Sequence, residues 1–415
     1  MTASPSPHTR PAMDIRPTTD EEFDVFVDTV HAAFGRFPET PNAREGVWWA
    51  ALEMDRNLFA VTADGRPVGT AGAYSFELTL PGRVVVPAAG ITVVGVLPSH
   101  RRQGVLNAMM RRQLADLRER GEFLSVLLAS EALIYRRFGY GPATYTTRLT
   151  VTRHRAALAV PRATGPADSG TVEVLRRSEC DKLLEDVYDR YRRAQPGALS
   201  RPHRWWAKGA GRPPVAPAPR YLAVHRDADG VPDGYACYSI EDPDTLVVDE
   251  IIAFDDAVDT ALTRFVLGHD LVSQVSFKHV APDHPLRWQL ADFRGAQVTD
   301  DTDWLWVRLL DVPRALTARG WFADGDLVLD VEDPFLGERA RYLLTVRDGR
   351  ADCVPTDRRP DLSLDVSDLA SVYLGGTAPS LLVRAGHIQA HHPDAAARAD
   401  ALFRAERAPH CLAWF

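Results

Sequence analysis

The sequence is poor in cysteine. Its four cysteines, Cys180, Cys237, Cys353 and Cys411, lie far apart and form neither a Cys-x-x-Cys pair nor a Cys/His ligand pattern. This spacing argues against both a disulfide framework and a zinc site, and it favours reduced thiols in a cytoplasmic protein. We therefore expect neither disulfides nor a metal to organise the fold.

Long apolar runs are also missing. No stretch approaches the roughly 18 consecutive apolar residues of a membrane span. The first twelve residues are rich in serine and proline and have no apolar centre, so they do not have the composition of a secretory signal. We predict a disordered tail over 1–12 and a cytoplasmic protein with no membrane partner.

Positive charge is not in excess either. Lysine and arginine total 48 against 56 aspartates and glutamates, which gives a net charge of −8. This balance disfavours nucleic acid as the main partner and is compatible with a cationic, amine-bearing substrate. A chain of 415 residues, 45% of them hydrophobic, is too long for one ordinary core. It predicts two or three domains.

Three units follow from the pattern along the chain. The first covers 13–152, with an amphipathic helix over 20–36, a hairpin over 58–76, two strands within 83–97 broken at 88–90, a helix over 105–120 and a buried strand over 123–129. The second covers 153–300, with helices near 177–194 and 257–269, strands at 221–225, 234–240 and 246–253, and a proline-rich loop at 209–219. The third covers 301–415, with strands at 304–309, 326–331, 341–347 and 362–365 and helices near 367–374 and 394–405. The first two units follow a similar order of elements, which is compatible with weak internal duplication.

The stretch from Ile91 to Asn107, ITVVGVLPSHRRQGVLN, joins an apolar strand to a helix through a short Arg/Gly loop. A helix N-terminus presents unpaired N–H groups and the positive end of the helix dipole, so it suits a pyrophosphate. Gly104 lets the backbone approach such a ligand, and Arg101 and Arg102 add charged donors. The alternative from the residues alone is a plain strand–turn–helix with surface arginines.

This run resembles the pyrophosphate motif of the GNAT acetyltransferases, Gln/Arg-x-x-Gly-x-Gly/Ala, except that its last small residue is replaced by Leu106. Residues 130–141, SEALIYRRFGYG, resemble the corresponding run of one GNAT branch, the enhanced intracellular survival (Eis) proteins. The resemblance implies that acetyl-CoA is the co-substrate. The residues that it implies for the cofactor site are Val94, Gly95, Val96, Arg101, Arg102, Gln103, Gly104, Val105, Leu106, Asn107, Ser130 and Glu131.

The same resemblance implies a catalytic pair. In the Eis family the tyrosine at the position of Tyr135 protonates the departing thiolate, and the carboxylate of the terminal residue, here Phe415, accepts the proton of the amine. A thiol titrates at about 8.5 and a phenol at about 10, so a slightly acidified tyrosine is a reasonable donor. The pKa of a terminal carboxylate is about 3.5 in water, and burial beside Trp414 would raise it. The backbone N–H of Val94 is the expected donor to the carbonyl oxygen.

Structural alternatives stand beside both residues. A tyrosine in an apolar helix is more often a core residue, and an aromatic C-terminus is more often a packed end.

Three other features carry less weight. Asp24 and Asp28 are expected on a solvated helix face. The tryptophan pairs at 48–49 and 205–206 are expected in the core or an interface, although one could line the substrate pocket. The histidines at 387, 391 and 392 have no ligand partner at metal-binding spacing, so we expect no metal site.

The resemblance implies an α+β protein with two GNAT-like domains, each a mixed sheet flanked by helices, and a C-terminal domain like the sterol carrier proteins. The second GNAT-like domain is expected to lack a cofactor site. The implied activity is acetyl transfer to amines of an aminoglycoside-like small molecule, by direct attack in a ternary complex within a homohexamer. Two alternatives remain open: acetylation of protein or peptide lysines, and a non-enzymatic lipid-binding or regulatory role for the third domain.

Overall fold

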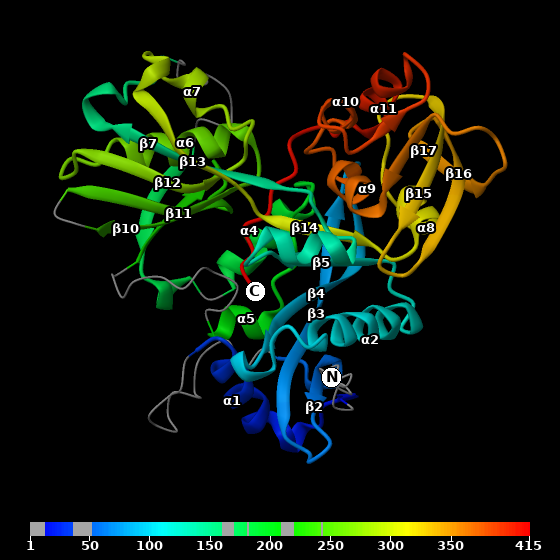
Figure 1. Cartoon of the computed structure of the whole chain (residues 1–415). Helices are drawn as coiled ribbons and strands as arrows, with labels where there is room; N and C mark the ends of the chain where they lie inside the picture. Colours follow the sequence, from blue (N-terminus) through cyan, green and yellow to red (C-terminus); the bar gives the residue numbers. More distant parts are fainter. Residues whose placement is uncertain (1–12, 36–51, 160–169, 181, 209–219, 242–243) are drawn as a thin grey trace, which may run out of the picture.

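The computed structural model describes residues 13–35, 52–159, 170–180, 182–208, 220–241 and 244–415. The predicted N-terminal tail, the proline-rich loop at 209–219 and the tryptophan pair at 48–49 lie outside the described residues. Three sheets organise the rest, one in each lobe of the molecule (Figure 1). The chain then returns from the third lobe, so that its C-terminus lies at the centre, beside the first sheet.

The first sheet has seven strands in the order β1-β2-β3-β4-β5-β14-β6. Its strands are β1 (Asp14–Pro17), β2 (Leu58–Val61), β3 (Pro67–Leu80), β4 (Val84–Val96), β5 (Leu124–Leu128), β14 (Leu305–Leu309) and β6 (Gly141–Pro142). The associated helices are α1 (Phe23–Ala33), α2 (Val105–Glu119) and α3 (Ala132–Tyr135). Strand β5 runs parallel to β4, whereas β14 arrives antiparallel from far along the chain.

The second sheet also has seven strands, ordered β13-β7-β12-β11-β10-β9-β8. They are β13 (Ala296–Asp303), β7 (Tyr145–Thr152), β12 (Gln274–Val280), β11 (Thr245–Ala253), β10 (Pro232–Glu241), β9 (Tyr221–Arg226) and β8 (Thr171–Leu175). Its helices are α4 (Leu183–Arg192), α5 (His203–Lys208), α6 (Asp256–Leu267) and α7 (Leu286–Gln289). Strands β11 and β12 are parallel and joined through α6, the same kind of crossover that joins β4 to β5 through α2.

The third sheet has the order β17-β16-β15-β18-β19. Its strands are β17 (Arg350–Pro355), β16 (Glu338–Arg347), β15 (Gly325–Asp333), β18 (Leu362–Asp365) and β19 (Gln389–Ala390). Helices α8 (Val312–Ala318), α9 (Val366–Tyr373), α10 (Pro379–Arg384) and α11 (Ala395–Phe403) accompany it. The sequence analysis assigned β7 to the first unit and β14 to the third. In the structure β7 lies in the second sheet and β14 in the first. The predicted domain boundaries remain a proposal.

Most helices and strands of the sequence prediction are present, within a few residues at each end. The prediction for 83–97 is wrong: these residues do not form two strands broken at 88–90, because β4 is one strand over Val84–Val96. Small residues at 88–90 suggested a break. They are instead in-register partners of β3 and β5, with Gly90 opposite both Tyr74 and Val126.

One apolar core joins the first sheet to the third. Its buried members include Phe76, Leu124 and Leu305 from the first sheet and Leu329 and Leu369 from the third unit. Two ion pairs cross the same boundary. Arg308 on β14, fully buried, pairs with Asp333 on β15, and Arg136 just after α3 pairs with Asp368 on α9 at 2.5 Å. The first and third units are therefore packed as one body around the segment that follows β5.

Candidate active site

Strands β4 and β5 separate after three paired positions, at 89–91 of β4 and 125–127 of β5. Immediately beyond, β4 carries a bulge, because Val93 and Val94 together lie opposite one residue of β3. Val93 has a φ of 47°, a left-handed conformation that bulky residues rarely adopt, and its carbonyl accepts a hydrogen bond from the Thr70 hydroxyl at 2.8 Å. The bulge turns the end of β4 away from β5.

The loop after β4 leads directly into α2. Arg102 and Gly104 both have positive φ, 63° and 88°, and Gly104 is the N-cap of α2. No side chain among the described residues caps this helix, so its first N–H groups stay available to an anion. Arg101 is held otherwise: its Nε donates to the Val96 carbonyl at 3.2 Å and its Nη2 to the Ala33 carbonyl at 2.9 Å. Arg101 therefore ties the loop to β4 and α1.

A pocket of about 1170 Å3 lies between the end of β4, the start of α2 and α3. Eleven of the twelve residues predicted for the cofactor line it: Val94, Gly95, Val96, Arg101, Arg102, Gly104, Val105, Leu106, Asn107, Ser130 and Glu131. Gln103 is not among the lining residues, and its side chain donates to the Ser99 carbonyl at 3.2 Å within the loop. Residues that the sequence analysis missed also line the pocket, among them Phe34, Ile134 and Arg137.

Tyr135 also lines this pocket, from the last position of α3. The residue is 7% exposed and belongs to the apolar cluster that contains Ala89 and Ile91 of β4. Burial raises the pKa of the phenol, and the hydrogen bond from Ser130 offsets part of that increase. The expectation of a slightly acidified tyrosine is therefore wrong, because desolvation outweighs the one hydrogen bond. The phenol stays protonated at neutral pH.

Phe415 does not line the pocket. Its ring packs edge-on against Phe76 of β3, with centroids 4.9 Å apart, and a Cβ on Gly90 would lie 3.1 Å from it. Successive residues of a strand face opposite sides. Because Tyr135 packs with Ala89 and Ile91, and Phe415 approaches at Gly90, the two residues flank β4 from opposite faces just before the bulge. Figure 1 shows the C-terminus beside β4.

The last residues reach this place through contacts with the rest of the chain. The Gln195 side chain donates to the Ala408 carbonyl at 2.9 Å, and the Trp304 indole donates to the Ala413 carbonyl at 3.1 Å. Gly90 is the position that sequence reasoning missed: a Cβ there would lie 2.2 Å from the Phe76 ring. A glycine inside a strand is the signal for such a close approach.

The features given less weight in the sequence are distributed over the fold. Trp205 is fully buried against Tyr74 and Phe76, and Asp24 lies on α1. His387 contacts Arg136 and Asp368 rather than a metal-type cluster. Within the described ranges, no group of three metal-type ligands was found, and no helix is long and apolar enough to cross a membrane.

Three family models match successive parts of the chain. A GNAT acetyltransferase domain model matches residues 14–143, a second GNAT acetyltransferase domain model matches 197–309, and a sterol carrier protein domain model matches 312–412. These matches confirm the predicted fold class.

Relatives align along nearly the whole chain. A protein named "Uncharacterized N-acetyltransferase" from Streptomyces griseus is 35% identical, with 96% of this chain and 99% of that protein covered. N-acetyltransferase Eis from Mycobacterium tuberculosis is also 35% identical, with 94% and 96% covered. The crystal structure of Eis1 from Mycobacterium abscessus superposes with a TM-score of 0.85 at 34% identity, over 97% of this chain and all of that one.

The hydrogen bond between the Ser130 and Tyr135 hydroxyls predicts how a mutation changes the pKa of Tyr135. Replacing Ser130 with alanine removes the hydrogen bond that stabilises the phenolate, so the pKa of Tyr135 should rise further above its ordinary value. Titration of 13C-labelled tyrosine by NMR measures this change. Ser125→Ala is the matched control, because Ser125 contacts Tyr140 at 2.7 Å and not Tyr135. A Tyr135 pKa that is unchanged or lower in Ser130→Ala would contradict this role of Ser130.

Proposed function

The chain belongs to the Eis family of GNAT N-acetyltransferases, and from this premise we propose that it acetylates amines of a cationic, aminoglycoside-like small molecule by direct attack in a ternary complex. The observation that carries the proposal is the position of one pocket. It lies where β4 and β5 separate and joins the uncapped start of α2 to the phenol of Tyr135. An anion site and a proton donor therefore open into the same cavity.

The residues present fit acetyl-CoA, the co-substrate of GNAT acetyltransferases. The start of α2 and the loop through Arg102 and Gly104 offer N–H donors and positive charge to a pyrophosphate. Val94, Gly95 and Val96 supply the strand edge beside it. When bound, acetyl-CoA supplies an acetyl group activated as a thioester. The pocket volume, about 1170 Å3, suits a ligand of the size of acetyl-CoA.

Tyr135 holds the proton that the departing sulfur needs. Its raised pKa keeps the phenol protonated at neutral pH, and the Ser130 hydroxyl stabilises the phenolate once that proton has left. The backbone N–H of Val94, at the bulge, is the donor to the carbonyl oxygen of the acetyl group. No cysteine lies among the described residues that line the pocket, which favours direct transfer over a thioester on the enzyme.

Phe415 supplies the base on the opposite face of β4. Its ring is fixed by Phe76 and by the absence of a side chain at Gly90, and its carboxylate accepts a proton from the attacking amine. Acid and base thus act from two sides of one strand. In this proposal the two groups act across the gap beyond Ile91, where β4 and β5 are no longer paired.

The acceptor class rests on kinship with the Eis proteins and on the net charge of −8, which favours a cationic substrate over nucleic acid.

A homohexamer in the cytoplasm belongs to the same proposal. Exposed large apolar residues on the second unit, Trp288 at 80% and Leu271 at 79%, are compatible with subunit contacts. Light scattering after gel filtration measures the assembly, and a monomer at micromolar concentration would overturn it.

An acceptor panel tests the substrate class. We expect labelled acetyl-CoA to transfer its acetyl group to aminoglycosides with several primary amines. Lysine-containing peptides at the same concentration should react at least about tenfold more slowly, as expected if binding favours the polycation. The opposite ranking would assign the chain to lysine acetylation. Absence of coenzyme A binding by calorimetry would remove the enzyme proposal altogether.

Tyr135→Phe should lower kcat by about 10²-fold, the usual scale for a positioned acid. Coenzyme A affinity should change little, because the phenol oxygen contributes little to the pocket that holds the pyrophosphate. Steady-state kinetics and calorimetry measure the two quantities. Tyr342→Phe is the control, since Tyr342 lies on β16 outside the pocket. Wild-type turnover in Tyr135→Phe would remove this residue from the mechanism.

Extending the chain beyond Phe415 should abolish transfer without unfolding the protein, because the terminal carboxylate would become a neutral amide. The same few residues added before Met1 serve as the control, and that form should retain activity. Coenzyme A binding should be the same in both extended forms. If the C-terminally extended form acetylates at the wild-type rate, the terminal carboxylate is not the base.

A further inference from the structure

The separation of strands that forms the pocket in the first sheet is repeated in the second. Strands β11 and β12 are paired over 245–248 and 274–277 and separate beyond those positions. Immediately afterwards β11 carries a bulge at Asp249, because Val248 and Glu250 lie opposite consecutive residues of β10. Helix α6 follows β11, as α2 follows β4. The second sheet therefore has an opening at the place where the first sheet has its pocket.

The start of α6 disfavours a phosphate in that opening. Asp255 is the N-cap of α6, and its side chain accepts from the N–H groups of Ala257 and Val258 at 3.0 and 2.9 Å. Asp256 and Asp259 add carboxylates in the first turn. An anion therefore finds the first N–H groups of α6 occupied and negative side chains around them, in contrast to the uncapped start of α2.

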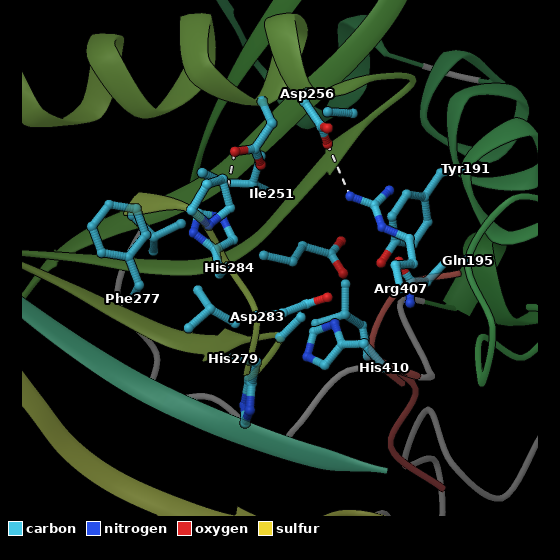
Figure 2. A pocket seen from close by; sticks show the side chains of 18 of the residues that line it. Tyr191, Gln195, Ile251, Asp256, Phe277, His279, Asp283, His284, Arg407 and His410 are labelled. Atoms are coloured by element: carbon cyan, nitrogen blue, oxygen red, sulfur yellow. Dashed lines mark hydrogen bonds and ion pairs between the residues drawn. The ribbon is translucent and has the colours of Figure 1, made fainter. Parts of the chain in front are cut away.

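The C-terminal segment, residues 407–413, occupies the opening of the second sheet (Figure 2). Arg407, His410 and Leu412 face the sheet, and the space left between them and the sheet is about 90 Å3, against about 1170 Å3 in the pocket at β4. Arg407 pairs with Asp256 at the start of α6 at 2.9 Å, a contact drawn as a dashed line in Figure 2. A guanidinium of the chain itself thus lies where the first sheet offers a site to an anion.

Hydrogen bonds to the backbone hold the C-terminal segment against the second unit. The Ala408 N–H donates to Asp283 at 2.8 Å, and the Ala408 carbonyl accepts from Gln195 at 2.9 Å. The His410 N–H donates to the Pro196 carbonyl at 2.8 Å. All three partners belong to the second unit, which therefore determines the path of the segment as far as His410.

The last two carbonyls of the segment accept from side chains. Nη2 of Arg201 donates to the Leu412 carbonyl at 3.4 Å, and the indole of Trp304 donates to the Ala413 carbonyl at 3.1 Å. Arg201 is buried and pairs with Glu250 of β11 at 2.7 Å, so its direction is fixed by the second sheet. The contact of Trp304 lies two residues before the chain ends.

Trp304 lies where the first sheet and the second meet. It is the one residue between β13 of the second sheet and β14 of the first. Its ring packs against that of His279 on β12, with centroids 4.7 Å apart. The next residue, Leu305, pairs with Leu128, one position beyond the last residue of β5 that pairs with β4. Trp304 is therefore at the end of β5 where the gap between β4 and β5 opens.

We propose that Trp304 is a positioning residue for the base: its indole fixes the backbone two residues before the terminal carboxylate, while the Phe415 ring is fixed against Phe76. This role rests on the proposed function, in which Phe415 is the base. A carboxylate on an anchored tail stays close to the amine, whereas the same group on a loose end samples many positions. The second unit thus serves the reaction by holding the tail in the opening that corresponds to the cofactor pocket.

Trp304→Phe removes the indole donor and keeps an aromatic ring. We expect kcat to fall about tenfold, the scale of one lost hydrogen bond that positions a reacting group. Coenzyme A affinity should not change, because Trp304 does not line the pocket at β4. Trp321→Phe is the matched control: its indole also donates to a backbone carbonyl, that of Leu316, at 3.1 Å, but within the third unit. This control should turn over like the wild type, and equal losses in both variants would overturn the role of Trp304.

The pH profile of kcat separates a misplaced base from a structural defect. The base takes a proton from the amine, so its position matters less as the pH rises through the pKa of the acceptor amine. The kcat deficit of Trp304→Phe should therefore shrink at high pH. His279, the ring beside Trp304, stays neutral over this range, because burial lowers its pKa to about 4. A deficit of the same size at every pH would contradict the positioning role.

Amide hydrogen exchange over 408–415, measured by mass spectrometry without substrates, tests the anchoring independently of the base. Exchange should be faster in Trp304→Phe than in the wild type and in Trp321→Phe. Unchanged exchange would show that the indole does not hold the tail. Faster exchange with wild-type turnover would also overturn the role of Trp304, provided that the C-terminally extended form is inactive. An active extended form would instead remove Phe415 as the base, and the positioning role with it.

Discussion

The packing of Phe415 beside β4 joins the third unit and the tail of the chain to the first sheet. Phe415 can reach Phe76 because position 90 carries no side chain. To bring the end of a 415-residue chain to that strand, the third unit must pack on the first and the tail must run back between the lobes. The continuous apolar core and the buried pair of Arg308 with Asp333 provide that packing. A buried pair of this kind adds little net stability, because both ions lose their hydration.

The helix that carries Tyr135 is also held by the third unit. Arg136, the next residue, pairs with Asp368 on α9, whose side chain is 2% exposed. Burial raises the pKa of that carboxyl in spite of its cationic partner, which shows how far desolvation dominates there. Gly139, three residues further on, has a φ of 82° and leaves room for the guanidinium of Arg308. Residues of the third unit thus determine where α3 ends and where its tyrosine lies, so this unit contributes to the geometry of the pocket without lining it.

Local chemistry made much of the fold and the cofactor pocket predictable. The Arg/Gly loop, the start of α2 and the apolar strand before it are encoded within a few residues, and eleven of the twelve predicted positions line one cavity. Gln103 does not line the pocket, because its side chain points back into its own loop. This orientation depends on the positive φ of its neighbours. The continuity of β4 was missed because small residues at 88–90 look like a break unless the ring that needs their space is known. The pairing of β14 with β5 was beyond reach as well, since it joins residues about 180 positions apart with no local signal.

The path of the tail brings the two ends of the chain together. Strands β4 and β5, the anion site and Tyr135 all lie within the first third of the chain, whereas Phe415, which approaches Gly90, lies at the other end. A protein that loses its last residue to a carboxypeptidase would present no phenylalanine ring at Gly90. The loss of a single residue at one end of the chain would therefore change the surroundings of a strand near the other end.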